Sequence, residues 1–219
     1  MQQSFEKAEA HLQSAISKVV SRRNVLNFRK NEVIFSQGDA ADALFHIQKG
    51  RVKLTVVSSS GKEATLSMFG ANELVGLGCL SFQKRRLGTA TALESSELIR
   101  IDRDSWFKLL REQPDLFEIA LAHLSNRNIE LQKDLCAQIL DPSERRLARI
   151  LLKLTQMGVE KRAPVFLPRI SHDTLASMVG TTRSRVTYFM NCFRKRGLIE
   201  YKGGVMVHPS RLNAALQDE

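Results

Sequence analysis

The sequence predicts an α+β fold with three parts in order: a strand-rich N-terminal β-roll, one long helix, and a C-terminal winged helix-turn-helix. Short apolar runs separated by turn residues predict the roll. A narrow apolar strip at helical spacing predicts the long helix, and two short amphipathic segments on either side of a glycine predict the helix-turn-helix. The predicted domains cover residues 1–113, 114–140 and 141–219.

The first predicted element is a short docking helix over residues 4–20, because Phe5, Leu12 and Ile16 fall on one helical face. From Val25 onward the pattern changes to short segments rich in β-branched and aromatic residues, which favour strands. The spacing of the turn signals is typical of a small antiparallel barrel or roll. The strand-forming segments are residues 25–29, 32–39, 43–50, 51–69 and 89–102, and the turn signals are Gly38-Asp39, Lys49-Gly50 and Ser60-Gly61-Lys62.

The second part contains a short helix and a long one. Asp104 is the predicted N-cap of a helix over residues 105–113, and Pro114 opens a helix that runs to about Ile139. The apolar residues of the long helix repeat at a/d spacing with Asn128 at an a position, as in the seam between two paired helices. We therefore predict a dimer helix, and the alternative is a helix that lies along its own roll. The predicted dimer interface consists of Phe117, Leu121, Leu124, Asn128, Leu131 and Leu135.

The third part begins with a predicted helix over residues 141–154 and continues into the helix-turn-helix. Ser171 is placed to cap the first helix of the motif, and Thr182 is placed to cap the second. Gly180 supplies the small residue and the left-handed backbone that the turn between them needs. Gly197 ends the second helix, and residues 198–202 and 205–208 are predicted to form two strands joined by two glycines, which is a winged arrangement.

The outer face of the second helix carries side chains that can contact base edges or phosphates, while Val186, Phe189, Met190 and Phe193 face inward. These side chains lie at the helix N-terminus, the end that enters the major groove of duplex DNA in this motif. A protein-binding three-helix module is the alternative. The predicted DNA-binding residues are Ser171, Thr181, Thr182, Arg183, Ser184, Arg185, Thr187, Tyr188, Asn191 and Lys202.

The charge of the chain agrees with DNA binding. The 219 residues carry a net charge of +10, and residues 141–219 hold 14 Lys and Arg against 7 Asp and Glu, a net charge of +7. The positive charge is therefore concentrated in the part that holds the helix-turn-helix, as a phosphate-binding surface requires.

Several classes of protein are not expected from this sequence. No run approaches the roughly 18 apolar residues that span a membrane, so we expect a soluble, cytoplasmic protein without a membrane partner. Cys79, Cys136 and Cys192 form no Cys-x-x-Cys pair, which argues against a disulfide framework or a zinc ribbon. We find no nucleophile–base pair, metal-spaced cluster or phosphate-binding Gly-rich loop with a Lys, so we do not expect an enzyme.

Three blocks together make the chain similar to the CRP/FNR family of bacterial transcription regulators over nearly its whole length. They are FSQGDAADALFHIQKGRVKL at residues 35–54, ELVGLGCL at 73–80 with RRLGTATALESSELIRI at 85–101, and LASMVGTTRSRV at 175–186. The resemblance implies a roll of the cyclic-nucleotide-binding type and a homodimer on a pseudo-palindromic site in double-stranded DNA. Its half-sites should lie about one helical turn apart, roughly 34 Å. It also implies contact with RNA polymerase.

The resemblance places an effector pocket in the roll, but this sequence departs from the cyclic-AMP-binding members. Their ribose-binding glutamate corresponds to Leu77, and the hydroxyl that follows their phosphate-binding arginine corresponds to Leu87, whereas Arg86 matches the arginine itself. Their Thr-Ser pair on the long helix corresponds to residues 130–131. Cyclic AMP is therefore not expected in the usual pose. The candidate pocket consists of Gly76, Leu77, Gly78, Arg85, Arg86 and Thr89.

The effector itself stays open between an unusual nucleotide, another small molecule and none. The cations at residues 84–86 suit a phosphate-containing ligand or a solvated loop equally. No cysteine precedes Cys79 to form an iron-sulfur cluster, and His46 and His123 are isolated, so neither a cluster, a haem nor a metal is expected. Cys79 is interpreted as a buried thiol or a redox sensor.

Two functional expectations follow. Arg183 matches a guanine-reading arginine of the family, whereas Ser184 and Tyr188 replace a glutamate and a second arginine, so we predict a target site unlike the known family consensus. The alternative to a DNA-binding regulator is a small-molecule or nucleotide sensor that acts chiefly through its roll.

Overall fold

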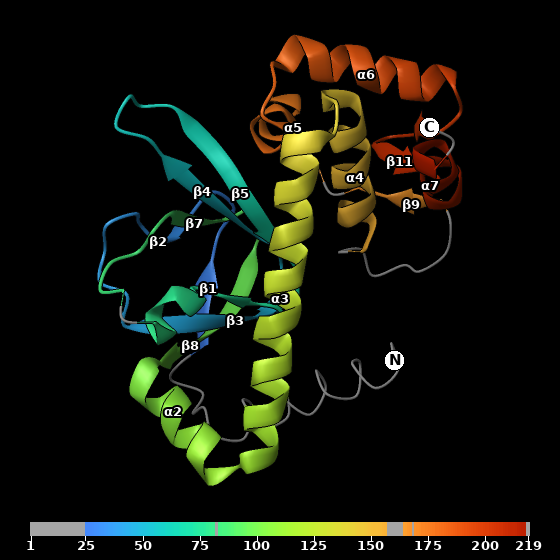
Figure 1. The fold of residues 1–219 in the computed structure, drawn as a ribbon. Coiled ribbons are helices and arrows are strands. Elements are labelled where there is room, and N and C mark those ends of the chain that lie inside the picture. The colour runs from blue at the N-terminus through green and yellow to red at the C-terminus, as the bar shows by residue number, and fades with distance from the viewer. Residues whose placement is uncertain (1–24, 82, 157–163, 168, 218–219) are drawn as a thin grey trace. The chain divides into compact units, whose positions relative to one another are not determined.

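The computed structural model describes residues 25–81, 83–156, 164–167 and 169–217 (Figure 1). The docking helix predicted over residues 4–20 lies outside the described residues. The chain divides after Leu131 into two compact units, each of which is described by itself. The domain boundaries predicted after residues 113 and 140 stay predictions.

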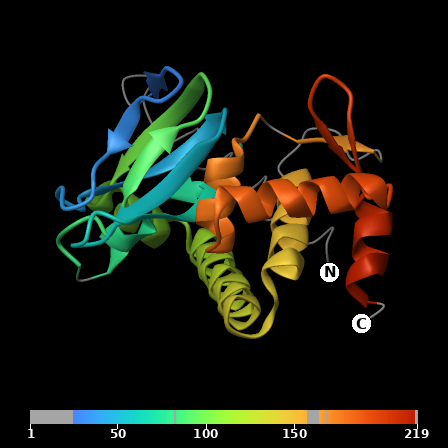
Figure 2. The same cartoon turned by 90° about the horizontal axis from the view of Figure 1, so that it is seen from above.

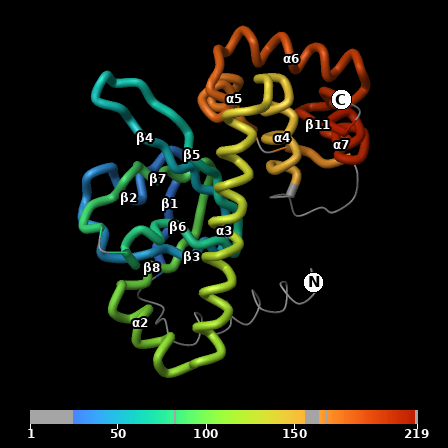
Figure 3. The backbone as a smooth tube through the Cα atoms, viewed as in Figure 1, coloured from blue at the N-terminus to red at the C-terminus, as the bar shows by residue number. Residues whose placement is uncertain are grey.

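The first unit contains the predicted β-roll, built from two four-stranded antiparallel sheets. One sheet has the strand order β1-β8-β3-β6 and the other has the order β2-β7-β4-β5. The predicted turns lie between β2 and β3, between β3 and β4, and at the tip of the β4–β5 hairpin (Figure 3). The short strand β6 and the 3-10 helix η2 were not predicted. The elements are β1 (Val25–Phe28), β2 (Val33–Phe35), β3 (Ala43–Lys49), β4 (Val52–Val57), β5 (Glu63–Phe69), β6 (Leu74–Val75), η2 (Leu77–Leu80), β7 (Thr89–Ala92) and β8 (Ser96–Asp102).

Alternation along the strands divides the core of the roll into two clusters. Phe45 and Ile47 of β3 face the space between the two sheets, where they pack with Phe35 and Leu98. Leu44 faces the other way, into a cluster formed with the helices that follow the roll. Because neighbouring residues of a strand point to opposite faces, the first five residues of β3 are buried on both faces, and all of them except His46 are apolar.

Helix α2 (Arg103–Glu112) follows β8 directly and covers the outer face of the sheet with Trp106 and Leu109. The prediction that Asp104 caps this helix was wrong. Asp102 has the extended backbone of the N-cap, and Asp104 lies in the first turn. The strand runs into the helix without a loop, so the helix begins two residues earlier than the side-chain pattern indicates.

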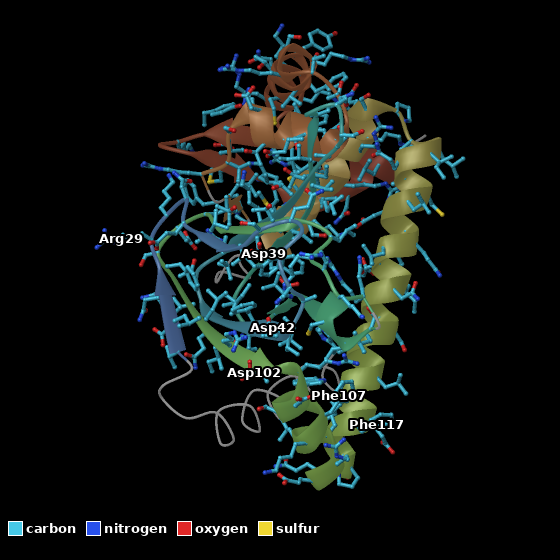
Figure 4. The ribbon with its side chains drawn as sticks, turned by 90° about the vertical axis from the view of Figure 1, so that its left-hand side faces the viewer. Arg29, Asp39, Asp42, Asp102, Phe107 and Phe117 are labelled. Atoms are coloured by element: carbon cyan, nitrogen blue, oxygen red, sulfur yellow. The ribbon has the colours of Figure 1, made fainter. Side chains whose placement is uncertain are left out.

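Helix α3 (Pro114–Leu140) has the predicted bounds to within one residue and two different faces. Leu116 and Ala120 are buried in the cluster under the sheet of β3 and β8. All six residues of the predicted seam are exposed, and the labelled Phe117 lies on α3 near its start (Figure 4). The helix therefore lies along its own roll with one face and leaves the predicted seam uncovered with the other.

The second unit contains the predicted winged helix-turn-helix and two elements that were not predicted. A three-stranded antiparallel sheet has the order β10-β11-β9, and its hairpin stands out from the helices of this unit (Figure 2). Strand β9 and helix α7 are the additions. The elements are α4 (Ser143–Gln156), β9 (Val165–Phe166), α5 (His172–Val179), α6 (Arg183–Lys195), β10 (Ile199–Tyr201), β11 (Val205–Val207) and α7 (Pro209–Gln217).

One polar side chain in the roll is buried without a partner. His46 of β3 lies between Leu74 of β6 and Ile99 of β8, and it is 4% exposed. Neither ring nitrogen has a hydrogen-bond partner among the described residues. Because burial penalises the charged imidazolium, the pKa of His46 falls from 6.5 to about 4.

We predict that acid destabilises the roll through His46. Below pH 6.5 the unfolded chain takes up a proton that the folded roll refuses until about pH 4, so stability is lost as pH falls through this window. The unfolding free energy of the roll, relative to that of the variant His46→Leu, should drop by about 2 kcal/mol between about pH 7 and about pH 5. Urea denaturation of both proteins measures this difference, and a difference independent of pH would contradict the assignment.

Candidate nucleic-acid interface and effector site

The helix pair α5–α6 is set by two side-chain caps and one glycine. The Ser171 hydroxyl accepts a hydrogen bond from the Thr174 N–H at 3.1 Å, and the Thr182 hydroxyl accepts one from the Arg185 N–H at 3.4 Å. Gly180 between them has φ +70° and ψ 44°, a left-handed conformation that favours glycine. The caps and the turn that the sequence predicts are therefore confirmed.

Helix α6 buries one face and exposes the other. Val186, Phe189, Met190 and Phe193 are each at most 7% exposed and form the inner face, as predicted. Of the ten predicted DNA-binding residues, nine are exposed and Thr181 is half-buried. All but Lys202 lie on the α5–α6 pair or its turn, and Lys202 lies in the loop between β10 and β11. The structure thus brings most of them onto one helix pair.

Some of these polar groups already have partners within the chain. The Thr187 hydroxyl donates to the Arg183 carbonyl at 3.0 Å and lies 2.9 Å from Nδ1 of His172. The Arg183 guanidinium lies 3.6 Å from the Asp173 carboxylate. The first turn of α5 therefore contacts the first two turns of α6 on the exposed side. Sequence reasoning missed His172 and Asp173 as members of this group, because spacing within one helix does not show which side chains of the two helices meet.

The base-reading candidates differ in how firmly they are held. Tyr188 is 65% exposed, and its ring meets the Phe189 ring edge-on at 5.7 Å. The hydrogen bond with Cys192 raises the pKa of Tyr188, so its phenol stays protonated and able to donate at neutral pH. The Arg185 guanidinium lies 5.8 Å from the centre of the Phe189 ring, which orients it on the exposed side.

The wing adds charge and aromatic surface beside this helix pair. The Lys202 ammonium pairs with Glu200 at 3.0 Å, and Glu200 also bonds His208 at 2.8 Å. These two bonds hold the pKa of Glu200 below its usual range, and the bond to Lys202 has the larger effect. Tyr201 is 45% exposed and Phe166 of the third strand is 52% exposed. A cationic loop flanked by exposed aromatic rings can contact a phosphate backbone.

The candidate effector site in the roll is built around a buried arginine. Arg86 is 7% exposed, and its Nη2 donates to the Ala43 carbonyl at 2.6 Å while Nη1 donates to the Gly76 carbonyl at 3.2 Å. The Asp42 carboxylate lies 3.6 Å from Nη2, and the guanidinium stacks on the Phe35 ring at 4.3 Å. Figure 4 shows the labelled Asp42 at this end of the sheet. The chain's own carbonyls and an aromatic ring thus hold the guanidinium.

The loop before this arginine is shaped by it. Gly76 has φ +84°, and a Cβ at this position would lie 2.8 Å from Nη1 of Arg86, so only glycine fits. Leu77 is half-buried and Gly78 is exposed, while Leu87 after the arginine is 63% exposed. The structure therefore brings Gly76 and Arg86 into contact.

The other two predicted pocket residues bond elsewhere. Arg85 is exposed and donates to the Gly38 carbonyl at 2.9 Å, and the Thr89 hydroxyl accepts from the Gln37 N–H at 3.0 Å. Both contacts join this segment to the turn after β2 rather than to the Gly76 loop.

Cys79 lies beside this site and is fully buried. Burial raises the pKa of its thiol, although the nearby Arg86 charge acts in the opposite direction. A protonated, inaccessible thiol fits the buried-thiol interpretation rather than the redox sensor. In the described part of the chain, no three His, Cys, Asp or Glu residues are grouped so that they could hold a metal ion. No helix in that part has the length and apolar character needed to cross a membrane.

Comparison with known proteins gives two domain matches. The cyclic nucleotide-binding domain family matches residues 25–113, and the Crp-like helix-turn-helix domain family matches residues 145–215. The first segment contains the candidate effector site around Arg86, and the second contains the helix pair α5–α6 and the wing.

Individual relatives match over most of their length. The chain is 30% identical to the Cyclic AMP receptor protein of Thermus thermophilus over 179 residues, which is 82% of this chain and 81% of the relative. It is 29% identical to the Global nitrogen regulator of a Nostoc species over 191 residues, 84% of this chain and 85% of the relative. The fold resembles that of FixK2 from Bradyrhizobium japonicum, with a TM-score of 0.77 at 16% identity over 87% of this chain and 95% of that one.

We predict that Arg183→Ala lowers DNA affinity at one base position of the preferred duplex. The Arg183 fork is exposed at the start of α6, where it can bond two acceptors of a guanine, and its loss should cost about 1 to 3 kcal/mol. Titrating the variant against duplexes that differ at single positions measures the loss. An equal loss on every duplex would make Arg183 a phosphate contact instead.

Proposed function

Because the chain belongs to the CRP/FNR family of transcription regulators, we propose that it acts as a homodimer whose two α6 helices read a two-fold symmetric site in double-stranded DNA. The observation that carries this proposal is the outer face of α6, where polar and basic side chains stand exposed beside the Gly180 turn. RNA polymerase is the proposed protein partner at the promoter.

The proposed division of labour follows the exposure of each side chain. Arg183, Ser184, Arg185 and Tyr188 contact base edges in the major groove. The remaining predicted residues contact the DNA backbone, since their hydroxyl, amide and ammonium groups suit phosphate oxygens, and two of them, Ser171 and Thr182, cap the helices. These are Ser171, Thr181, Thr182, Thr187, Asn191 and Lys202.

The exposed strip on α3 supports the homodimer. Phe117, Leu121 and Leu135 are each more than half exposed, Leu131 is 50% exposed, and these large apolar side chains follow one another along one face of the helix. A second copy of α3 is the partner that matches this strip in length and period, with Asn128 facing Asn128 to fix the register. Pairing of the two α3 helices creates a two-fold axis, and two α6 helices related by this axis would enter successive major grooves.

The roll supports an effector other than cyclic AMP in its usual pose. Arg86 is the residue that would bind a cyclic phosphate, and two of its five N–H donors point instead to the carbonyls of Ala43 and Gly76. Leu77 and Leu87 offer neither an acceptor for a ribose nor a hydroxyl for a phosphate. A second candidate function is a small-molecule sensor acting through the roll, which the exposed cation of Arg85 beside this site favours.

We predict that the parental protein, but not Leu131→Glu, enriches two-fold symmetric duplexes from a random library. A glutamate in the seam places two like charges between the helices and prevents pairing, so each α6 would bind alone. Sedimentation should show a dimer for the parental chain and a monomer for the variant. Asn126→Glu adds the same charge to an exposed position off the strip and serves as the control. Enrichment of symmetric sites by Leu131→Glu would contradict the dimer.

We predict that Arg86→Met destabilises the roll by about 2 to 4 kcal/mol, because it removes a donor from the buried Ala43 carbonyl and another from the half-buried Gly76 carbonyl. Arg85→Met, which alters an exposed neighbour, should change the unfolding free energy far less.

Millimolar cyclic AMP should leave the melting temperature of the parental protein unchanged. A stabilisation by cyclic AMP that disappears in Arg86→Met would overturn the proposed role of this arginine.

A further inference from the structure

The last two turns of α3 belong to the unit that holds the helix-turn-helix. The division of the chain falls after Leu131, so residues 132–140 of the helix are part of the same compact unit as α4, α5 and α6. The seam residue Leu135 therefore lies in the DNA-binding unit, as does Ile139, which is 71% exposed. The end of α3 is attached to the rest of this unit through contacts with α4.

Two ion pairs join the end of α3 to α4. The Lys153 ammonium donates to the Asp134 carboxylate at 2.7 Å. Nε of Arg149 donates to the Asp141 carboxylate at 2.6 Å, and the Asp141 side chain is only 13% exposed. The contacts run antiparallel, because the later residue of α4 meets the earlier residue of α3.

Arg146 adds a third attachment between these ion pairs. Its Nη1 donates to the Gln138 carbonyl at 3.0 Å and lies 3.4 Å from the Asp141 carbonyl. Carbonyls in the last turn of a helix lack partners within the helix, so this guanidinium caps α3 from outside. The Gln138 side chain also reaches the turn of the helix-turn-helix, where its Nε2 lies 2.8 Å from the Cβ position that Gly180 leaves empty.

The spacing of these residues makes them one surface on each helix. Asp134 and Gln138 are four residues apart, so they lie on one face of α3, and Asp141 directly follows the end of that helix. The three basic residues of α4 follow at three and four residues and face them. Leu135 and Ile139 lie on another face of the same turns, so a partner helix can cover them while the contacts stay in place.

Helix α4 carries the connection on to the recognition helix. Leu147 and Leu151 are fully buried where α4 packs against α5 and α6. At its first turn, Glu144 lies 3.5 Å from Arg196, the residue that ends α6. Packed side chains and one ion pair therefore connect α4, and through it the end of α3, with α6.

We propose that a clamp formed by Asp134, Gln138, Asp141, Arg146, Arg149 and Lys153 positions α6 with respect to the last turns of α3, which carry the seam residue Leu135. These are positioning residues, since none of them lies on the outer face of α6. The clamp sets the distance and angle between the two recognition helices of a dimer, and hence the half-site spacing that the protein accepts. This inference rests on the proposed dimeric DNA binding.

The test uses charge reversal in the full-length chain. Asp134→Lys sets two ammonium groups against each other, and the double variant Asp134→Lys/Lys153→Asp restores an opposite pair in reversed order. The single variant should lose about five-fold in affinity for a duplex with two half-sites, and the double variant should regain it. Affinity for a single half-site should not fall in either protein, because α6 itself is unchanged.

The sign of this result separates the clamp from simple attraction to DNA. Asp134→Lys adds positive charge, which by itself tightens binding to phosphates. Glu112→Lys on α2 is the matched control, since it adds the same charge and breaks the 3.8 Å pair of Lys108 and Glu112 in the other unit. If Asp134→Lys binds the two-half-site duplex as tightly as Glu112→Lys does, the clamp is wrong.

Two further outcomes are distinguishable from these. Should Asp134→Lys lower the melting temperature, the neutral Asp134→Asn replaces it, with a smaller loss in the same direction expected. A parental protein that gains nothing from a second half-site would instead contradict the proposed dimeric binding. A failure of the clamp leaves that gain intact in both the parental protein and Asp134→Lys.

Discussion

The two-faced character of helix α3 is the constraint on which the rest of the molecule depends. Leu116 and Ala120 bury one face against the roll, while Leu121 and Leu124 leave the opposite face in solvent. Each fully buried leucine contributes about 1.5 to 3 kcal/mol, so an uncovered apolar strip of this length favours association strongly. The last residues of the same helix belong to the DNA-binding unit, so we expect the pairing of two α3 helices to affect where the two α6 helices lie.

The two sites of the chain differ in what they still offer to a partner. At the start of α6, Arg185 and Tyr188 are exposed. Both contact Phe189, and Tyr188 also bonds Cys192, on a surface where their side chains can reach a base edge. In the roll, Arg86 is surrounded by the carbonyls of Ala43 and Gly76. These two charge-assisted hydrogen bonds fix the orientation of the guanidinium within the roll, so a ligand that used this arginine would bind it in that orientation or break them. The candidate base-contacting side chains of α6 are thus exposed, whereas the Arg86 guanidinium is already bonded within the roll.

The fold was predictable where local chemistry decides it. The inner face of α6 and the caps at Ser171 and Thr182 follow from periodicity and hydroxyl positions, and both are confirmed. Strand β9 and helix α7 escaped prediction, since a two-residue strand exists only through its pairing with β11. Contacts such as Arg149 with Asp141 and Arg86 with Ala43 depend on which helices and strands become neighbours, and single-sequence spacing does not contain that information.

In the proposed complex, a dimer formed through α3 places two α6 helices on one symmetric DNA site. Hydroxyl-radical footprinting of the full-length protein on the duplex that it selects tests this arrangement most directly. We predict two equivalent protected blocks related by a two-fold axis, with centres roughly 34 Å apart, one for each α6 helix. A single protected block without symmetry would contradict a dimer arranged around α3.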